Sequence, residues 1–121
     1  MKPIKILIAD DHRDFRRVVH EFLDRLPNVS VIGEACDGDE AVEQVEKLTP
    51  DIVLMDIHMP VRSGLDATRD IKDRFPQTKV VVLSMYTGEL YRTMAGEAHA
   101  DGFIEKQSMK SELLAMIQQE Q

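Results

Sequence analysis

Residues 51–56 have the sequence DIVLMD, a nearly continuous apolar run that is followed by an acid at Asp56. A run without alternating polar residues predicts a strand, at 51–55, that is buried on both faces between layers of helices. Similar short apolar runs occur on both sides of it, at 4–9, 29–34, 79–84 and 102–106. Five stretches of helical period alternate with these runs. This alternation predicts an α/β protein with a parallel sheet of five strands and helices on both faces.

The helical stretches carry their own start and stop signals. The first has an apolar stripe at helical spacing and ends before Pro27; the stripe consists of Phe15, Val18, Val19, Phe22, Leu23 and Leu26. The last helix, near 109–118, is expected to bury Leu113, Leu114 and Ile117 after a cap at Ser108. The fourth, near 88–98, is predicted to be the weakest, because Gly88 and Gly96 are poor helix formers.

Two further helices begin with paired capping residues. Asp37 can cap the second helix while Glu40 reaches back to the preceding backbone, and Ser63 with Asp66 forms a similar pair at the start of the third. These pairs predict where the second and third helices begin.

Three acids gather at one edge of the predicted sheet. Right-handed crossovers favour a doubly wound sheet of strand order 2-1-3-4-5, in which ligands bind where the order reverses, between the first and third strands. Asp10 and Asp11 follow the first strand, and Asp56 follows the third. Adjacent carboxylates repel, and a site made only of oxygens suits Mg²⁺. Each acid alone is also compatible with a helix cap or a loop residue.

Two other residues end strands at the same edge. Ser84 follows VVVL and Lys106 follows GFIE. Singly, they are compatible with a strand-end cap and a solvated charge, but together they offer a hydroxyl donor and a cation to a phosphoryl group above Asp56.

The length and composition of the chain limit the number of domains and the kinds of partner that we expect. The chain has 121 residues, 43% of them hydrophobic, which suits a single domain over 1–121. The net charge of −7 opposes direct binding to nucleic acid, and the single Cys36 lacks metal-ligand spacing to any histidine. We find no signal peptide or membrane span and expect no membrane partner and a cytoplasmic location.

The motifs ADD, PDIVLMDIHMPVRSGLDA, VVVLS and DGFIEK resemble, in order and spacing, the receiver domains of two-component response regulators. The stretches ADDH, GEACDGDEAVE and LSMY are most similar to the NarL/FixJ-like branch, whose members commonly carry a LuxR-type DNA-binding output domain. The resemblance covers almost the whole chain and implies a flavodoxin-like (βα)5 fold.

The resemblance also implies roles for the acids. Asp56 would accept a phosphoryl group from a phosphohistidine on a sensor histidine kinase, without the protein being an enzyme in the ordinary sense. Mg²⁺ would be the cofactor, bound by Asp11, Asp56 and the backbone carbonyl of His58, with Asp10 acting mainly through a water.

Other positions match the switch of the family. Ser84 and Lys106 would contact the phosphoryl oxygens, and Phe103 would be the aromatic residue that turns inward on activation. His58 and Tyr86 would flank the phosphoryl group and tune its lifetime. The shift would reach the fourth helix, the fifth strand and the fifth helix.

The partners implied are a sensor histidine kinase, a second copy of the chain on activation, and DNA only through an output domain that is absent from these residues. Gln107 replaces the proline that usually follows the lysine, so we expect a trans Lys106–Gln107 bond. The alternatives are a degenerate receiver that acts as a phosphorylation-independent interaction module, and an aspartyl-nucleophile phosphatase that requires Mg²⁺. The phosphatase would need an acid where this chain has His58.

Overall fold

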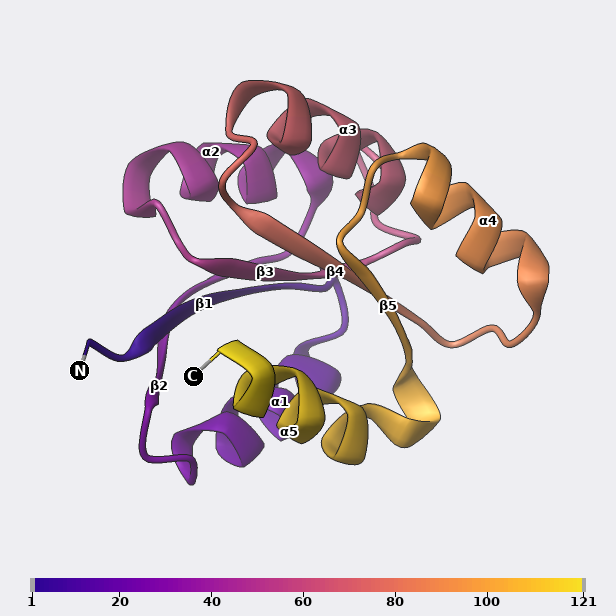
Figure 1. Cartoon of the computed structure of the whole chain (residues 1–121). Helices are drawn as coiled ribbons and strands as arrows, with labels where there is room; N and C mark the ends of the chain where they lie inside the picture. The colour runs from indigo at the N-terminus through magenta and orange to yellow at the C-terminus, as the bar shows by residue number, and fades with distance from the viewer. Residues whose placement is uncertain (1, 121) are drawn as a thin grey trace.

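The sheet has five parallel strands in the predicted order. The structure is a computed structural model that describes residues 2–120 (Figure 1). The strands pair in the order β2-β1-β3-β4-β5. Their bounds are Ile4–Ala9 for β1, Val29–Ala35 for β2, Ile52–Asp56 for β3, Lys79–Ser84 for β4 and Gly102–Glu105 for β5. The order reverses between β1 and β3, so the predicted ligand position exists in the fold.

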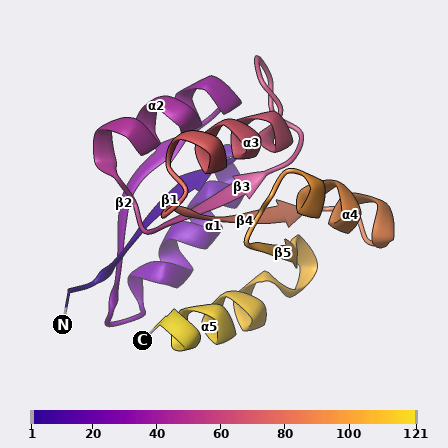
Figure 2. The same ribbon diagram turned by 45° about the horizontal axis from the view of Figure 1, so that its top comes forward.

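The helices form two layers, as expected for a doubly wound sheet. Helices α1 (Arg13–Asp24) and α5 (Met109–Glu120) cover one face, while α2 (Gly38–Leu48), α3 (Gly64–Arg74) and α4 (Glu89–Glu97) cover the other (Figures 1 and 2). A short 3-10 helix, Lys106–Ser108, leads into α5. Within residues 2–120, we find no helix with the length and apolar content needed to cross a bilayer.

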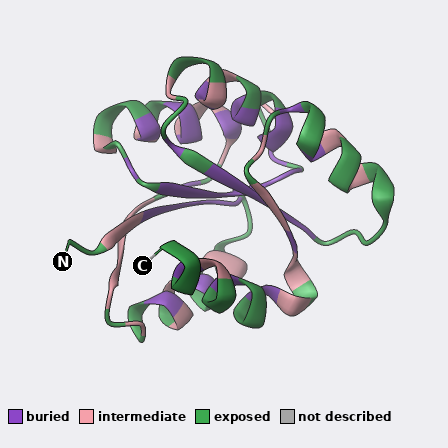
Figure 3. Ribbon diagram, in the orientation of Figure 1, coloured by how far each residue is buried: buried purple, intermediate pink, exposed green. Residues whose placement is uncertain are grey.

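The central strands are buried (Figure 3). Successive residues of these strands belong to different cores. Ile6, Ile8 and Leu54 pack with residues of α1 and α5. Leu7 and Val53 pack with residues of α2 and α3. The continuous apolar run at 52–55 therefore contributes to two cores, which is why it lacks alternation.

Three strand boundaries differ slightly from the predictions. The strand β2 continues to Ala35, and β5 ends at Glu105, so Lys106 belongs to the following 3-10 helix. The strand β3 begins at Ile52 and includes Asp56, which pairs in register with Leu83. Asp51 lies just outside the strand, and its carboxylate accepts a hydrogen bond from the backbone N–H of Lys5 at 2.8 Å.

The apolar helix faces were predicted too broadly at two positions. Val18 is 44% exposed and Leu114 is 38% exposed. Val18 lies at the edge of the α1 stripe, and Leu114 is turned about 100° from Leu113 on α5, so neither points at the sheet. The remaining residues of both predicted stripes are buried or partly buried against the same core.

The predicted helix caps are confirmed for α2 and α3. The side chain of Asp37 accepts from the N–H of Glu40, whose carboxylate accepts from the N–H of Cys36. Ser63 accepts from the N–H of Asp66.

The predictions for Ser108 and Gly88 were wrong in detail. Ser108 ends the 3-10 helix that runs directly into α5, so it does not start a separate helix. Gly88 is the residue before α4, with φ of 111°, so its backbone freedom is used at a turn and costs the helix nothing.

Candidate functional site

Three carboxylates meet where the strand order reverses. Asp10 follows β1, Asp11 is next to it, and Asp56 ends β3. Ligand atoms of these acids and of His12 all lie within 4.8 Å of one another. Asp10 and Asp56 are buried, at 1% and 5% exposure, while Asp11 is more open to solvent. The predicted acidic cluster is therefore present in the fold.

Lys106 places a cation inside this cluster. Its ammonium lies 2.7 Å from Asp10 Oδ2 and 3.1 Å from Asp56 Oδ1, and the side chain is 8% exposed. The ammonium also lies 4.2 Å from the centre of the Phe15 ring, a cation–π contact that shields it from water. One lysine therefore faces three carboxylates, and the site keeps an excess of negative charge.

Burial and charge act together on Asp56. Burial, followed by the charge of Asp10, raises the pKa of Asp56 from its ordinary 3.8 to about 6, although Lys106 acts in the opposite direction. Asp11 adds a smaller raising effect. A divalent cation would relieve this repulsion, and three carboxylates are a suitable donor set for Mg²⁺. The residues present therefore fit the cofactor predicted from the sequence.

Ser84 lies at the same edge but is held locally. It is 1% exposed. Its hydroxyl donates to the carbonyl of Tyr86 at 3.1 Å and accepts from the Tyr86 N–H at 3.0 Å. Serine commonly forms such bonds to the backbone two residues later in a turn at the end of a strand. The Ser84 hydroxyl is therefore bound to the β4–α4 loop.

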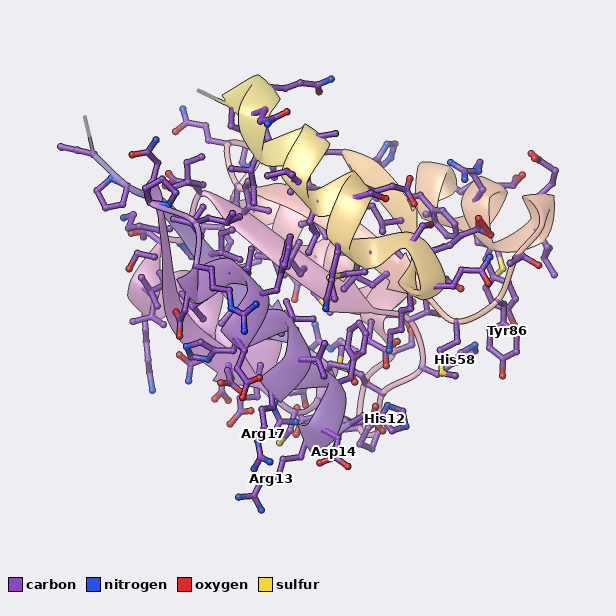
Figure 4. All side chains as sticks on the ribbon, turned by 90° about the horizontal axis from the view of Figure 1, so that it is seen from below. His12, Arg13, Asp14, Arg17, His58 and Tyr86 are labelled. Carbon is purple, nitrogen blue, oxygen red and sulfur yellow. The ribbon has the colours of Figure 1, made fainter. Side chains whose placement is uncertain are left out.

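Three aromatic rings, from the loops after β3 and β4 and from α4, contact one another. Tyr86 and Tyr91 are stacked with ring centres 5.0 Å apart, and His58 meets them edge-on at 5.5 and 5.6 Å. Figure 4 shows His58 and Tyr86 together, with His12 at the start of α1. The two residues predicted to tune the site are thus in contact with each other.

The comparisons with known proteins agree with this geometry. Residues 6–118 match the family model described as the response regulator receiver domain. The chain belongs to the response regulator receiver family. Its NarL-like character is supported by the structure of the signal receiver domain of the putative response regulator NarL from Mycobacterium tuberculosis. That structure has a TM-score of 0.92 at 28% identity, over 98% of this chain and 96% of the other.

Two curated relatives and one further solved structure are also similar to this chain. The transcriptional regulatory protein DegU of Brevibacillus brevis is 41% identical over 94% of this chain and 48% of its own length. The oxygen regulatory protein NreC of Staphylococcus aureus is 39% identical over 94% of this chain and 53% of its own. The crystal structure of a LuxR-family response regulator from Aurantimonas sp. SI85-9A1 has a TM-score of 0.90 at 32% identity, over 97% of this chain and 84% of its own. This receiver chain spans about half the length of the curated relatives.

The receiver departs from the common family pattern as expected at Gln107. Residues 2–120 contain no cis peptide bond, so the Lys106–Gln107 bond is trans, and Lys106 still reaches both acids. Phe103 is partly buried on β5 beside Ala95 and Ala98. The guanidinium of Arg92 lies 4.7 Å from the centre of its ring. An aromatic residue at this position therefore contacts α4, the helix expected to respond.

Two residues of the receiver site were missed in the sequence. The backbone N–H of His12 donates to Asp10 Oδ1 at 2.8 Å, and its ring nitrogen lies 3.1 Å from both Asp10 and Asp11. Arg16 donates to the backbone carbonyl of Asp10 at 2.7 Å and pairs with Glu34 at 2.8 Å. The signal was their spacing: four residues apart at the start of a helix, they lie on one side next to the acids.

Proposed function

We propose that this receiver domain is a phosphoacceptor switch in which Asp56 takes a phosphoryl group from a phosphohistidine of a sensor histidine kinase. The observation that carries the proposal is the buried Asp56 carboxylate at the end of β3, with Lys106 at 3.1 Å and two further acids beside it. The match to the receiver family supports the same function.

The transfer needs an ionised Asp56. With its pKa raised to about 6, the carboxylate is ionised at neutral pH yet poorly solvated, which suits a nucleophile. One carboxylate oxygen forms a bond to phosphorus as the phosphorus–nitrogen bond of the donor breaks. The departing imidazole keeps the electron pair and takes up a proton. The product is an acyl phosphate on Asp56.

Asp10, Asp11, Asp56 and the backbone carbonyl of His58 are the groups that we propose hold Mg²⁺. When bound, Mg²⁺ would supply positive charge to the phosphoryl oxygens and to the carboxylates. Lys106, already between two of the acids, can pair with another phosphoryl oxygen.

The proposed switch begins with the hydrogen bond that the Ser84 hydroxyl donates to the Tyr86 carbonyl. To donate to a phosphoryl oxygen, its hydroxyl has to release the Tyr86 carbonyl, which now accepts its single hydrogen. That movement shifts the β4–α4 loop, and Phe103 turning inward would carry the change to α4, β5 and α5. Phosphorylation changes the populations only through such differential contacts.

The output of the switch is proposed from relatives. DegU carries the name of a transcriptional regulatory protein, and it is about twice as long as this chain. We propose that residues 1–121 act as one receiver unit that controls transcription through a DNA-binding domain outside them, with dimerisation on activation. A molar mass by light scattering that stays monomeric with a phosphoryl mimic would contradict the dimer.

The test of the phosphoacceptor is the intact mass after incubation with acetyl phosphate, with and without Mg²⁺. We expect a gain of one phosphoryl group that requires Mg²⁺, is lost in Asp56→Asn and persists in Asp73→Asn, an exposed control on α3. If Mg²⁺ binds in calorimetry but no sample gains mass, the result would favour either a receiver that accepts the phosphoryl group only from its kinase or the phosphorylation-independent module.

A further inference from the structure

The loop between β3 and α3 contains a strained turn close to Asp56. Val61 has φ of 69°, in the left-handed region that branched residues rarely adopt. The backbone N–H of Arg62 donates to the carbonyl of Pro60 at 2.7 Å, closing a three-residue γ-turn around Val61. A γ-turn with positive φ is rare and strained. Because Val61 is 78% exposed, packing of its own side chain does not hold this conformation.

The next residue, Arg62, ties the loop to two helices. Its Nε lies 2.8 Å from Asp39 Oδ1 at the start of α2, and its Nη1 lies 2.7 Å from Asp70 Oδ2 on α3. The Arg62 backbone also lies flush against α2, since a Cβ on Gly38 would come within 2.1 Å of the Arg62 carbonyl oxygen. The same loop is closed at its end by the Gly64 N–H, which donates to the Ile57 carbonyl at 2.7 Å.

We propose that Arg62 is a positioning residue: its guanidinium bridge between Asp39 and Asp70 holds the β3–α3 loop, strained at Val61, in the conformation that serves the Asp56 site. This inference rests on the proposed function, in which the loop presents the His58 carbonyl to Mg²⁺. Single ion pairs at a surface contribute little, but one planar guanidinium that binds two carboxylates on separate elements restrains a loop geometrically.

The first test measures the loop itself, without Mg²⁺. Amide hydrogen exchange over residues 57–64 is compared in the wild type, Arg62→Met and Arg69→Met. Arg69 is the matched control, because it pairs with Asp66 on its own helix at 2.8 Å and spans no loop. We expect amide exchange to be about fivefold to tenfold faster in Arg62→Met than in the wild type, because two partly exposed ion pairs are lost. In Arg69→Met, we expect exchange within about twofold of the wild-type rate. Equal exchange in all three proteins would overturn the proposal.

The second test measures Mg²⁺ affinity by calorimetry. Removing a positive charge near an acidic site should strengthen Mg²⁺ binding, so weaker binding in Arg62→Met reports lost positioning and not lost charge. We expect a dissociation constant about threefold to tenfold higher in Arg62→Met and no increase in Arg69→Met. An unchanged or lower constant in Arg62→Met would overturn the positioning role.

A third variant separates positioning from general stability. Asn tolerates positive φ better than Val, so Val61→Asn should relieve the strain that the Arg62 bridge opposes. In the Val61→Asn protein, adding Arg62→Met should raise the Mg²⁺ dissociation constant by less than half the factor that Arg62→Met causes in the wild type. An undiminished factor would contradict the coupling. If the wild type binds no Mg²⁺, the proposed function fails, while the exchange measurement still decides whether Arg62 restrains the loop.

Discussion

Replacing Asp56 with Asn should stabilise the protein at neutral pH when Mg²⁺ is absent. Asp56 is 5% exposed, and its pKa is raised from 3.8 to about 6, chiefly by burial. A carboxyl with a raised pKa favours folding below its unfolded pKa, and this contribution is lost as the pH rises through the folded value. Since each tenfold change in acidity constant corresponds to about 1.4 kcal/mol, the ionised form costs at most about 3 kcal/mol of unfolding free energy.

The net gain in Asp56→Asn is expected to be about 1–3 kcal/mol, because one favourable contact is lost as well. Lys106 gives up the carboxylate at 3.1 Å but keeps Asp10 at 2.7 Å, so the lysine remains paired. At a pH of about 4, where the folded wild type already has a protonated Asp56, most of this gain should disappear.

Urea unfolding followed by far-UV circular dichroism at both pH values measures this difference. The exposed Asp73→Asn should change stability by less than about 0.5 kcal/mol at either pH. Saturating Mg²⁺ should narrow the gap between the wild type and Asp56→Asn, because the cation binds the folded wild type. A variant that is less stable than the wild type at neutral pH, or a gain that is equal at both pH values, would refute the electrostatic reasoning.

Three other predictions concern separate parts of the protein. Gly64→Ala should lower the free energy of unfolding in urea by about 3 kcal/mol or more, because the new Cβ would lie 1.7 Å from the Asp56 carbonyl oxygen. The control Gly96→Ala, which has open space around it on α4, should raise the free energy of unfolding by up to about 1 kcal/mol. Lys106→Met should destabilise the protein by about 3 kcal/mol at neutral pH and by less in acid, since it leaves buried carboxylates unpaired, and a loss that does not depend on pH would contradict this. His58→Asn should shorten the lifetime of the acyl phosphate, measured by intact mass over time, because the smaller side chain opens the site to water; an unchanged lifetime would remove His58 from that role.

The sheet and its acidic edge could be predicted from the sequence because both depend on strong local patterns. Continuous apolar runs fix the buried strands, and parallel strands bring their carboxyl ends to one edge, so Asp10, Asp11 and Asp56 had to meet. The helix starts were equally accessible, since the capping side chains of Asp37 and Ser63 bind backbone only a few residues away.

The details that escaped prediction depend on contacts between distant residues. Arg16 reaches Glu34 only when α1 is docked beside β2. His12 is an exception, because it contacts acids one and two residues away, and there only the spacing was overlooked. The exposure of Val18 depends on the angle at which α1 lies on the sheet, which periodicity alone does not give. The bridge formed by Arg62 joins residues on two separate helices and has no local signature.

The contact between Lys106 and Asp10 spans 96 positions of the chain. During synthesis, the three acids leave the ribosome well before the lysine that partly neutralises them. The strand that leads into Lys106, β5, is the last strand along the chain, and it pairs with β4 at the edge of the sheet. A growing chain therefore cannot form the contact between Lys106 and Asp56 until nearly all of residues 1–121 have been translated.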